Sequence, residues 1–203
     1  MKLHTFSDAS TKGYGQCIYL RSVNAANKVH VTLISSKARV TPVKSITIPR
    51  LELQAAHGAV TLTQKVINEL HLLNAQTYYY TDSEVVLGYI TNTEARFHTF
   101  VANRVERICD HSKSEQWFHV PTDINPADHA LRGLNPCRLQ SSNWFTGPEF
   151  LWNEPIKLPR QPKHQISSTD KEIKAISLST HHMQAYASID ERITRFSHLD
   201  QAV

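Results

Sequence analysis

Cysteine is scarce in this sequence of 203 residues, and its three cysteines lie far apart. Cys17, Cys109 and Cys137 form no Cys-x-x-Cys pair and are odd in number, so the pattern predicts neither a disulfide framework nor a thiolate zinc site. His181 and His182 predict no zinc site either, because no cysteine follows Cys137 to complete a set of ligands. The cysteine pattern fits a reducing compartment best.

Long apolar runs are also missing. The opening residues MKLHTFSDAS lack the apolar core of a signal peptide, and no segment approaches the roughly 18 apolar residues of a membrane-spanning helix. We therefore expect a protein that is neither secreted nor embedded in a membrane. The excess of positive charge is small, with a net charge of +4 and a pI near 9.0. This balance is compatible with a polyanionic partner but is also common in proteins that bind nothing acidic.

The composition is that of a folded protein, because 40% of the residues are hydrophobic and charges of both signs are present. The length suffices for one domain of about 130 to 150 residues and an extension. Beyond Gly133 prolines recur among aromatic residues, which favours an extended segment. We predict a domain over residues 1–135, a strap over residues 136–163 that packs on its core, and a linker or incomplete following region over residues 164–203.

Hydrophobic periodicity predicts an α/β fold with a mixed five-stranded sheet flanked by helices. Three consecutive β-rich segments indicate an antiparallel meander, and two later strands alternate with helices. The expected strands are residues 3–7, 14–21, 29–35, 76–81 and 116–120, and the expected helices are residues 49–71, a short one from 85, one over 97–108 and one from 126. A basic loop is expected over residues 37–44.

Four carboxylates fall at the predicted boundaries between these elements: Asp8, Glu52, Asp82 and Asp128. If the first and fourth strands are neighbours, Asp8 and Asp82 emerge side by side, and the long helix brings Glu52 over the same edge. Clustered carboxylates repel one another unless cations neutralise them, and their hard oxygen atoms select Mg²⁺ or Mn²⁺. Each residue alone has a structural alternative, because acidic residues at helix starts commonly cap the helix or complement its dipole.

Several polar and basic residues are candidates for contacts with nucleic acid. Lys37, Arg39, Lys44 and Arg50 cluster between the third strand and the long helix, and Arg104 and Arg107 extend this basic track along a later helix. The alternative for each is a solvated surface charge. The remaining candidates are Ser83, Asn125 and Arg132, for which a helix cap at Ser83 and an Asx turn at Asn125 are the structural alternatives.

Five segments in order carry a family resemblance: TFSDAS followed by Gly13 and Gly15; SKARVTP followed by ITIPRLELQAA; YYYTDSEVVLGYI; RFHTFVANRVERI; and WFHVPTDINPADHALRG. In sequence and spacing they resemble the RNase H region of BEL/Pao-type LTR retrotransposon polyproteins. The similarity covers about residues 4 to 153 and includes NWFTGPEFLW in the strap. Residues 178–197 are similar to the stretch before the zinc-binding part of the integrase in these polyproteins.

This resemblance implies an RNase H-like fold in which Asp8, Glu52, Asp82 and Asp128 hold two Mg²⁺ or Mn²⁺ ions. The implied activity is cleavage of the RNA strand of an RNA·DNA hybrid. The implied partners are the hybrid and the reverse transcriptase and integrase regions of the same polyprotein. We accordingly expect an intracellular location in the cytoplasm, in a virus-like particle or in the nucleus.

One other function remains open, and a third is disfavoured by the segment around Asp128 and the helix that carries Glu52. The domain can be a catalytically lapsed or domesticated remnant that binds nucleic acid, although the intact set of four carboxylates favours an active nuclease. An integrase core shares the broad fold but normally uses three acidic residues, the last a glutamate on a helix. One departure concerns the segment before Asp128, where cellular RNases H carry a histidine and Pro121 to Asn125 contains none.

Overall fold

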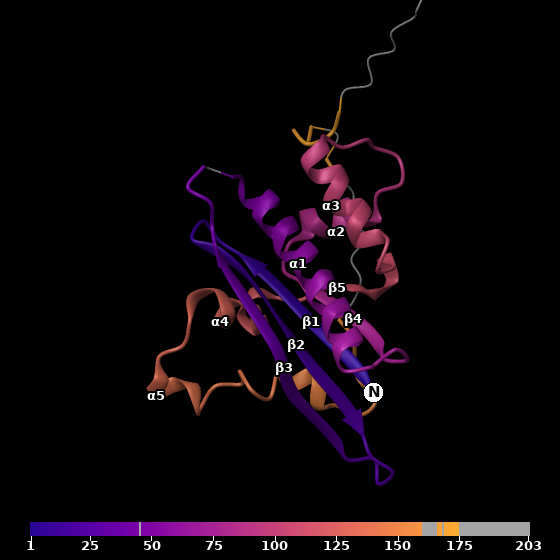
Figure 1. The fold of residues 1–203 in the computed structure, drawn as a ribbon, viewed down its shortest axis with the longest axis vertical. Helices are drawn as coiled ribbons and strands as arrows, with labels where there is room; N and C mark the ends of the chain where they lie inside the picture. Colours follow the sequence, from indigo (N-terminus) through magenta and orange to yellow (C-terminus); the bar gives the residue numbers. More distant parts are fainter. Residues whose placement is uncertain (45, 160–165, 168, 175–203) are drawn as a thin grey trace, which may run out of the picture.

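The structure is a computed structural model that describes residues 1–44, 46–159, 166, 167 and 169–174 (Figure 1). The elements in chain order are β1 (Lys2–Ala9), β2 (Gly13–Val23), β3 (Val29–Val40), α1 (Ile48–Glu69), β4 (Gln76–Thr81), α2 (Glu84–Thr91), α3 (Thr99–Cys109), β5 (Trp117–His119), α4 (Ala127–Arg132) and α5 (Pro136–Leu139). Short 3-10 turns lie at Ser114–Gln116, Thr122–Ile124 and Glu149–Trp152. Residues 178–197, with the integrase-like stretch and both of its adjacent histidines, lie outside the described residues.

The five strands form one sheet in the order β3-β2-β1-β4-β5. β1 pairs antiparallel with β2, and β2 with β3, whereas β1 with β4 and β4 with β5 are parallel. The predicted mixed five-stranded sheet flanked by helices is confirmed. In Figure 1, α1, α2 and α3 lie on one side of the sheet and α4 lies on the other.

Successive side chains of β1 and β2 point to opposite faces of the sheet, so the core is divided between the α1 side and the α4 side. On the α1 side, Leu3 and Ile18 pack with Val66 of the helix. On the opposite side, Phe6 and its neighbours form a cluster that includes Ala127 at the start of α4. Both faces of the central strands are therefore covered, and the polar ends of β1 and β4 are left to form a site at the edge.

β3 is longer than the sequence predicts. The strand continues to Val40 instead of ending near residue 35, because Gly13 to Gln16 of β2 pair with its second half. The prediction of a basic loop over residues 37–44 is wrong for its first half: Lys37 and Arg39 are strand residues. Hydrogen bonding of the backbone, which side-chain polarity does not reveal, determines where this strand ends.

Two helix boundaries also differ from the prediction. α3 begins at Thr99, and Phe97 lies before it in a β-bridge with Ile173, a residue 76 positions later in the chain. α1 ends at Glu69 instead of residue 71, which leaves the apolar side chain of Leu70 half exposed. The hydrophobic pattern of these segments continues past the ends of the helices.

The described part of the strap packs along the outer face of the sheet. Trp144, Phe150, Ile156 and Leu158 contact the core cluster around Phe6. The side chain of Arg21, only 2% exposed, crosses beneath this segment. Its guanidinium donates hydrogen bonds to the Leu151 and Asn153 carbonyls, both at 2.7 Å, and to the Glu154 carboxylate at 2.5 Å. The strap is thus fastened to β2 by one buried cation.

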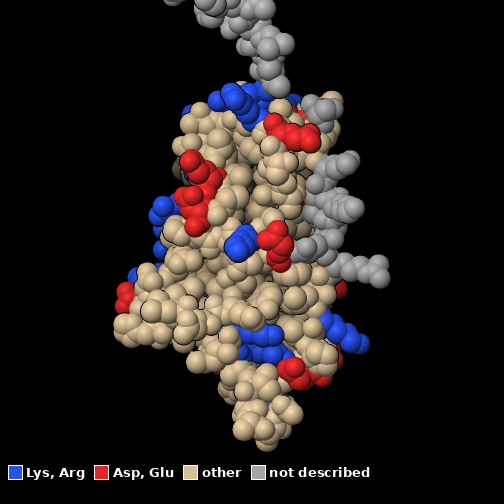
Figure 2. All heavy atoms as spheres, turned by 90° about the vertical axis from the view of Figure 1, so that its right-hand side faces the viewer, with Lys and Arg blue, Asp and Glu red and all other residues tan. Residues whose placement is uncertain are grey.

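Charges of both signs are scattered over the face of the molecule that carries α2 and α3 (Figure 2). Neither sign forms a continuous patch over this view. None of the helices in the described residues is long and apolar enough to cross a membrane.

We predict that Arg21→Met lowers the free energy of unfolding by about 2–4 kcal/mol, because it removes a buried cation and leaves two carbonyls and a carboxylate without their donor. Urea unfolding of the purified protein measures the change. Glu154→Gln is the matched control, since Glu154 is half exposed and glutamine still accepts a hydrogen bond. A loss for Arg21→Met no larger than that for Glu154→Gln contradicts the fastening role.

Candidate active site

The parallel pairing of β1 with β4 places two of the four carboxylates side by side. Ser7 lies opposite Thr81 in the register, so Asp8 near the end of β1 and Asp82 just after β4 emerge at the same edge of the sheet. Glu52 reaches this edge from α1, and Asp128 from the start of α4. The predicted helix, beginning at residue 49, places Glu52 in its first turn. This placement is wrong: α1 begins at Ile48, so Glu52 lies in the second turn.

Electrostatic interactions connect all four carboxylates. Burial, followed by the charges of Asp82 and Asp128, raises the pKa of Asp8 to about 7. Burial and the charge of Asp82 also raise the pKa of Glu52, against the opposing effect of a hydrogen bond from Ser83. The interactions therefore run from Asp128 through Asp8 and Asp82 to Glu52, and the structure brings the predicted quartet to one place.

Hydrogen bonds orient each carboxylate. The Ser83 hydroxyl donates to Glu52 Oε2 at 2.5 Å and accepts from the Val86 N–H, so Ser83 both caps α2 and holds Glu52. The Thr122 hydroxyl donates to Asp82 Oδ2 at 2.7 Å. The backbone N–H of Ala9 donates to Asp8 Oδ1 at 2.7 Å. Thr122 is a site residue that the sequence analysis missed, because a threonine in a short turn carries no chemical signature of its own.

Asp128 has a cationic partner within its own helix. The Arg132 guanidinium donates to Asp128 Oδ1 at 2.5 Å, an i,i+4 pair on the exposed side of α4. The predicted nucleic-acid contact at Arg132 is thus engaged with one of the four carboxylates. This ion pair leaves the more deeply buried Asp8 to bear the repulsion of its acidic neighbours.

Asn125 and Gly15 set the distance between α4 and the sheet. The buried Asn125 amide donates to the Ser7 carbonyl at 3.1 Å and accepts from the Ala127 N–H at 3.1 Å, which forms the Asx turn considered from the sequence. A Cβ on Gly15, which pairs with Asp8, would lie 3.2 Å from Ala130 Cβ. α4 therefore approaches the strand closely enough to carry Asp128 to Asp8.

A divalent metal ion suits this donor set, although in the described part of the chain no three His, Cys, Asp or Glu side chains already converge as a metal site. The hydrogen-bond donors that orient the carboxylates engage one oxygen on each: the backbone N–H of Ala9 and the side chains of Ser83, Thr122 and Arg132. The candidate metal ligands are all carboxylate oxygens, and after burial the charges of Asp82 and Asp128 contribute to the raised pKa of Asp8. Hard oxygen ligands with uncompensated charge favour Mg²⁺ or Mn²⁺.

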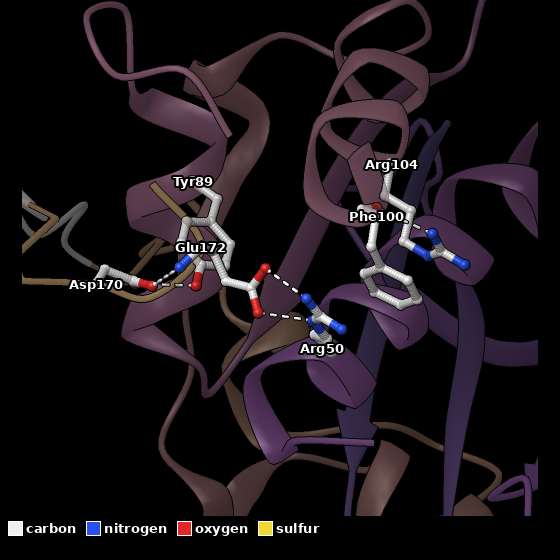
Figure 3. Close-up of polar contacts among 6 residues, drawn as sticks. All are labelled: Arg50, Tyr89, Phe100, Arg104, Asp170 and Glu172. Carbon is white, nitrogen blue, oxygen red and sulfur yellow. Dashed lines mark hydrogen bonds and ion pairs between the residues drawn. The ribbon is translucent and has the colours of Figure 1, made fainter. Parts of the chain in front are cut away.

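Arg50 and Arg104 are engaged with other parts of the protein (Figure 3). Arg50 forms a bidentate ion pair with the largely buried Glu172, at 2.6 and 2.9 Å. Arg104 stacks on the ring of Phe100, with its guanidinium carbon 3.5 Å from the centroid, and donates to Gln54 Oε1 at 2.6 Å. These two predicted contacts lie between α1, α3 and the segment around Glu172.

The other predicted basic contacts are exposed. Lys44 lies in the loop before α1, and Arg107 lies on the outer side of α3. Lys37 and Arg39 lie opposite Gln16 and Tyr14 in the β2–β3 register. Together with these partners they line a groove beside α1.

Residues 1–83 match the model of a family described as "Pao retrotransposon-like RNaseH-like domain". The resemblance to this family is confirmed over these residues. Three solved structures are similar to part of the chain. The chain is 14% identical to the N-terminal RNase H domain of a Mycobacterium tuberculosis protein, with 63% of this chain and 92% of that chain covered and a TM-score of 0.44. The chain is also 14% identical to an RNase H1 isolated from compost, with coverages of 63% and 91% and a TM-score of 0.44.

An RNase H1 from Halobacterium salinarum is 12% identical, with coverages of 63% and 91% and a TM-score of 0.39. No curated protein matches the chain.

The raised pKa of Asp8 predicts a pH dependence of stability in the absence of divalent ions. Because the native state holds this proton up to a pH of about 7 and the unfolded chain releases it near the ordinary value of 3.8, stability falls as the pH rises between these values. Asp8→Asn removes this loss and is expected to be about 1–3 kcal/mol more stable than the unaltered protein at pH 8.

Urea unfolding in EDTA at pH 5 and pH 8 measures this difference. The exposed Asp110→Asn is the control. Equal stabilities of Asp8→Asn and the unaltered protein at pH 8 would contradict the buried, repelled state of this carboxyl.

Proposed function

We propose that this chain is a metal-dependent endonuclease of the RNase H type that hydrolyses the RNA strand of RNA·DNA hybrids during reverse transcription of a retrotransposon. The observation that carries the proposal is the electrostatically connected quartet Asp8, Glu52, Asp82 and Asp128 at the edge of an RNase H-like sheet. The family description of residues 1–83 supports the same assignment.

The four carboxylates are the proposed ligands of two Mg²⁺ or Mn²⁺ ions. When bound, two such ions lower the pKa of an attacking water and stabilise the leaving 3′ oxygen of the RNA. The water oxygen forms a bond to phosphorus as the bond from phosphorus to the 3′ oxygen breaks, and the products are a 5′ phosphate and a 3′ hydroxyl. Hydrolysis in one displacement needs no nucleophile from the protein.

The chain's own residues hold the geometry for this reaction. Ser83 orients Glu52, Thr122 orients Asp82, and Asn125 fixes the start of the helix that carries Asp128. Arg132 pairs with Asp128 and would have to release or share this carboxylate if cations occupied the site. These are positioning residues, and the four carboxylates are the catalytic residues of the proposal.

The proposed partners and locations are those that the family resemblance of the sequence implies. They are the RNA·DNA hybrid and the reverse transcriptase and integrase regions of one polyprotein, in the cytoplasm, a virus-like particle or the nucleus. A catalytically lapsed, domesticated nucleic-acid-binding remnant is the second candidate. The observation that favours it is the Arg132–Asp128 ion pair, because an internal cation then satisfies one of the four ligands.

We predict that saturating Mg²⁺ or Mn²⁺ raises the melting temperature by several degrees, because an ion that binds only the native state stabilises it. About 2.7 kcal/mol is expected at 100 times the dissociation constant. Differential scanning fluorimetry with and without the ions measures the shift. Asp8→Asn is expected to lose most of it and Asp110→Asn to keep it. A full shift in Asp8→Asn would remove this carboxylate from the ligands.

We predict that Asp82→Asn lowers the rate of RNA cleavage by about 100-fold or more, since a lost metal ligand removes several kcal/mol of transition-state stabilisation. Its loss of folding stability is expected to be about 1 kcal/mol or less, because asparagine keeps the size of the side chain and can still accept from Thr122. Cleavage of a labelled hybrid in Mg²⁺ measures turnover, and anisotropy in Ca²⁺ measures binding.

The matched control is Asp110→Asn, and duplex DNA is the control substrate. If Asp82→Asn cleaves at a near-normal rate, the two-metal site is wrong. If the unaltered protein binds hybrid but never cleaves it, the lapsed remnant is the better assignment, and equal cleavage of duplex DNA favours the integrase-type alternative.

A further inference from the structure

A groove separate from the carboxylate edge runs between α1 and the paired strands β2 and β3. Its volume is about 170 Å³. Two cross-strand pairs form one wall, Tyr14 with Arg39 and Gln16 with Lys37. The α1 wall is formed by residues that recur at helical spacing: Gln54, His57, Gly58, Thr61, Leu62 and Lys65. Residues opposite each other in antiparallel strands point to the same side, so both pairs face the helix.

The groove is positively charged. Lys37, Arg39 and Lys65 line it, no acidic residue does, and none of the three forms an ion pair with the described residues. Burial and the charges of Arg104 and Arg107 lower the pKa of His57, which therefore acts in the groove as a neutral hydrogen-bonding ring. Cationic groups without internal partners are suited to phosphate oxygens.

Gln16 gives the groove a second polar feature. Its side chain is 3% exposed, and its Oε1 has no hydrogen-bond partner among the described residues. The amide lies against Gly58, where an added Cβ would come within 3.0 Å of Gln16 Nε2. A buried polar atom without a partner destabilises a protein by about 1–3 kcal/mol, so such groups usually meet a ligand or water. The unpaired atom is an acceptor, as is a phosphate oxygen, so the amide must rotate by about 180° to present its NH₂ to a phosphate.

The groove and the candidate active site share α1, which carries both Glu52 and the helical wall of the groove. Gln54 follows Glu52 by two residues, and Lys65 lies about 20 Å beyond Glu52 along the helix axis, at 1.5 Å per residue. This length corresponds to several phosphates of one strand, which follow one another at about 3.4 Å along a duplex axis. A groove lined by several cationic side chains, Lys37, Arg39 and Lys65, suits the successive phosphates of a nucleic-acid strand better than a single anion.

We propose that this groove binds the phosphodiester backbone of a nucleic-acid strand as it leaves the catalytic edge, with Lys37, Arg39 and Lys65 contacting phosphates and Gln16 donating from its amide. The inference rests on the proposed function, and it assigns roles to Gln16 and Lys65. A hybrid of about 8 base pairs centred on the cut extends only about 14 Å to either side and does not reach Lys65. Lys65 therefore contributes to the binding of long hybrids only.

The experiment measures the affinity of the full chain for hybrids of about 8 and about 18 base pairs by anisotropy in Ca²⁺ over a range of salt concentrations. Lys65→Gln is expected to weaken binding of the long hybrid about 3- to 10-fold and to lower the slope of log affinity against log salt by about one. Binding of the short hybrid is expected to change less than about twofold. The charge-matched control is Lys28→Gln, in the exposed β2–β3 turn.

Gln16→Leu separates a binding role from a structural one. Leucine keeps the size of the side chain but removes a polar atom that has no partner, so the melting temperature is expected to stay or rise while the long hybrid binds more weakly. A lower melting temperature with unchanged binding would make Gln16 a structural residue and overturn its assignment.

The remaining outcomes are equally decisive. Equal effects of Lys65→Gln and Lys28→Gln on the long hybrid, or equal losses for short and long hybrids, overturn the groove. Titration with inorganic phosphate tests for a site that takes free anions: saturation of the groove by phosphate without any effect on the long hybrid also overturns it. If neither hybrid binds, the proposed function itself fails; if both bind and the variants match the unaltered protein, only the groove fails.

Discussion

β1 and β4 lie parallel and adjacent, with Ser7 opposite Thr81, and every other part of the candidate site is arranged around this pairing. Parallel neighbours end at the same edge of a sheet, so the residues that follow them, Asp8 and Asp82, are forced together. A parallel pair needs a long crossover connection, and here the connection contains α1 and delivers Glu52 to the same edge. The pairing thus explains how carboxylates separated by more than 70 residues meet.

Concentrating negative charge at this edge opposes folding. Burial is the largest cause of the raised pKa values of Asp8 and Glu52, and the charges of neighbouring carboxylates raise both further. Hydrogen bonds from the neutral hydroxyls of Ser83 and Thr122, together with packing on both faces of the sheet, offset the repulsion among these carboxylates. Strain of this kind is expected where a protein prepares a place for a cation.

The sequence predicts much of the fold because strand alternation and helical periodicity survive in the central elements, and the five-stranded sheet follows from them. It also singles out the four carboxylates, because each lies near a predicted boundary of an element and within a segment that resembles the family, and in the structure electrostatic interactions connect them. It does not predict that β3 extends through Arg39, since pairing with β2 decides this, nor that Arg50 binds Glu172 across 122 residues. Contacts between residues far apart in the chain depend on tertiary packing, which leaves no local pattern in the sequence. For the same reason the sequence predicts neither the role of Thr122 nor the groove around Gln16.

The close contact between Gly15 and α4 limits which residues position 15 can accept. A methyl group there would meet Ala130 Cβ at 3.2 Å and the Leu131 nitrogen at 3.4 Å, so α4 would have to move outward by a few tenths of an ångström. That helix carries Asp128, and the strand residue paired with Gly15 is Asp8. One hydrogen atom in place of a side chain thereby sets the separation of two carboxylates that belong to different layers. A side chain at position 15 would therefore shift Asp128 relative to Asp8.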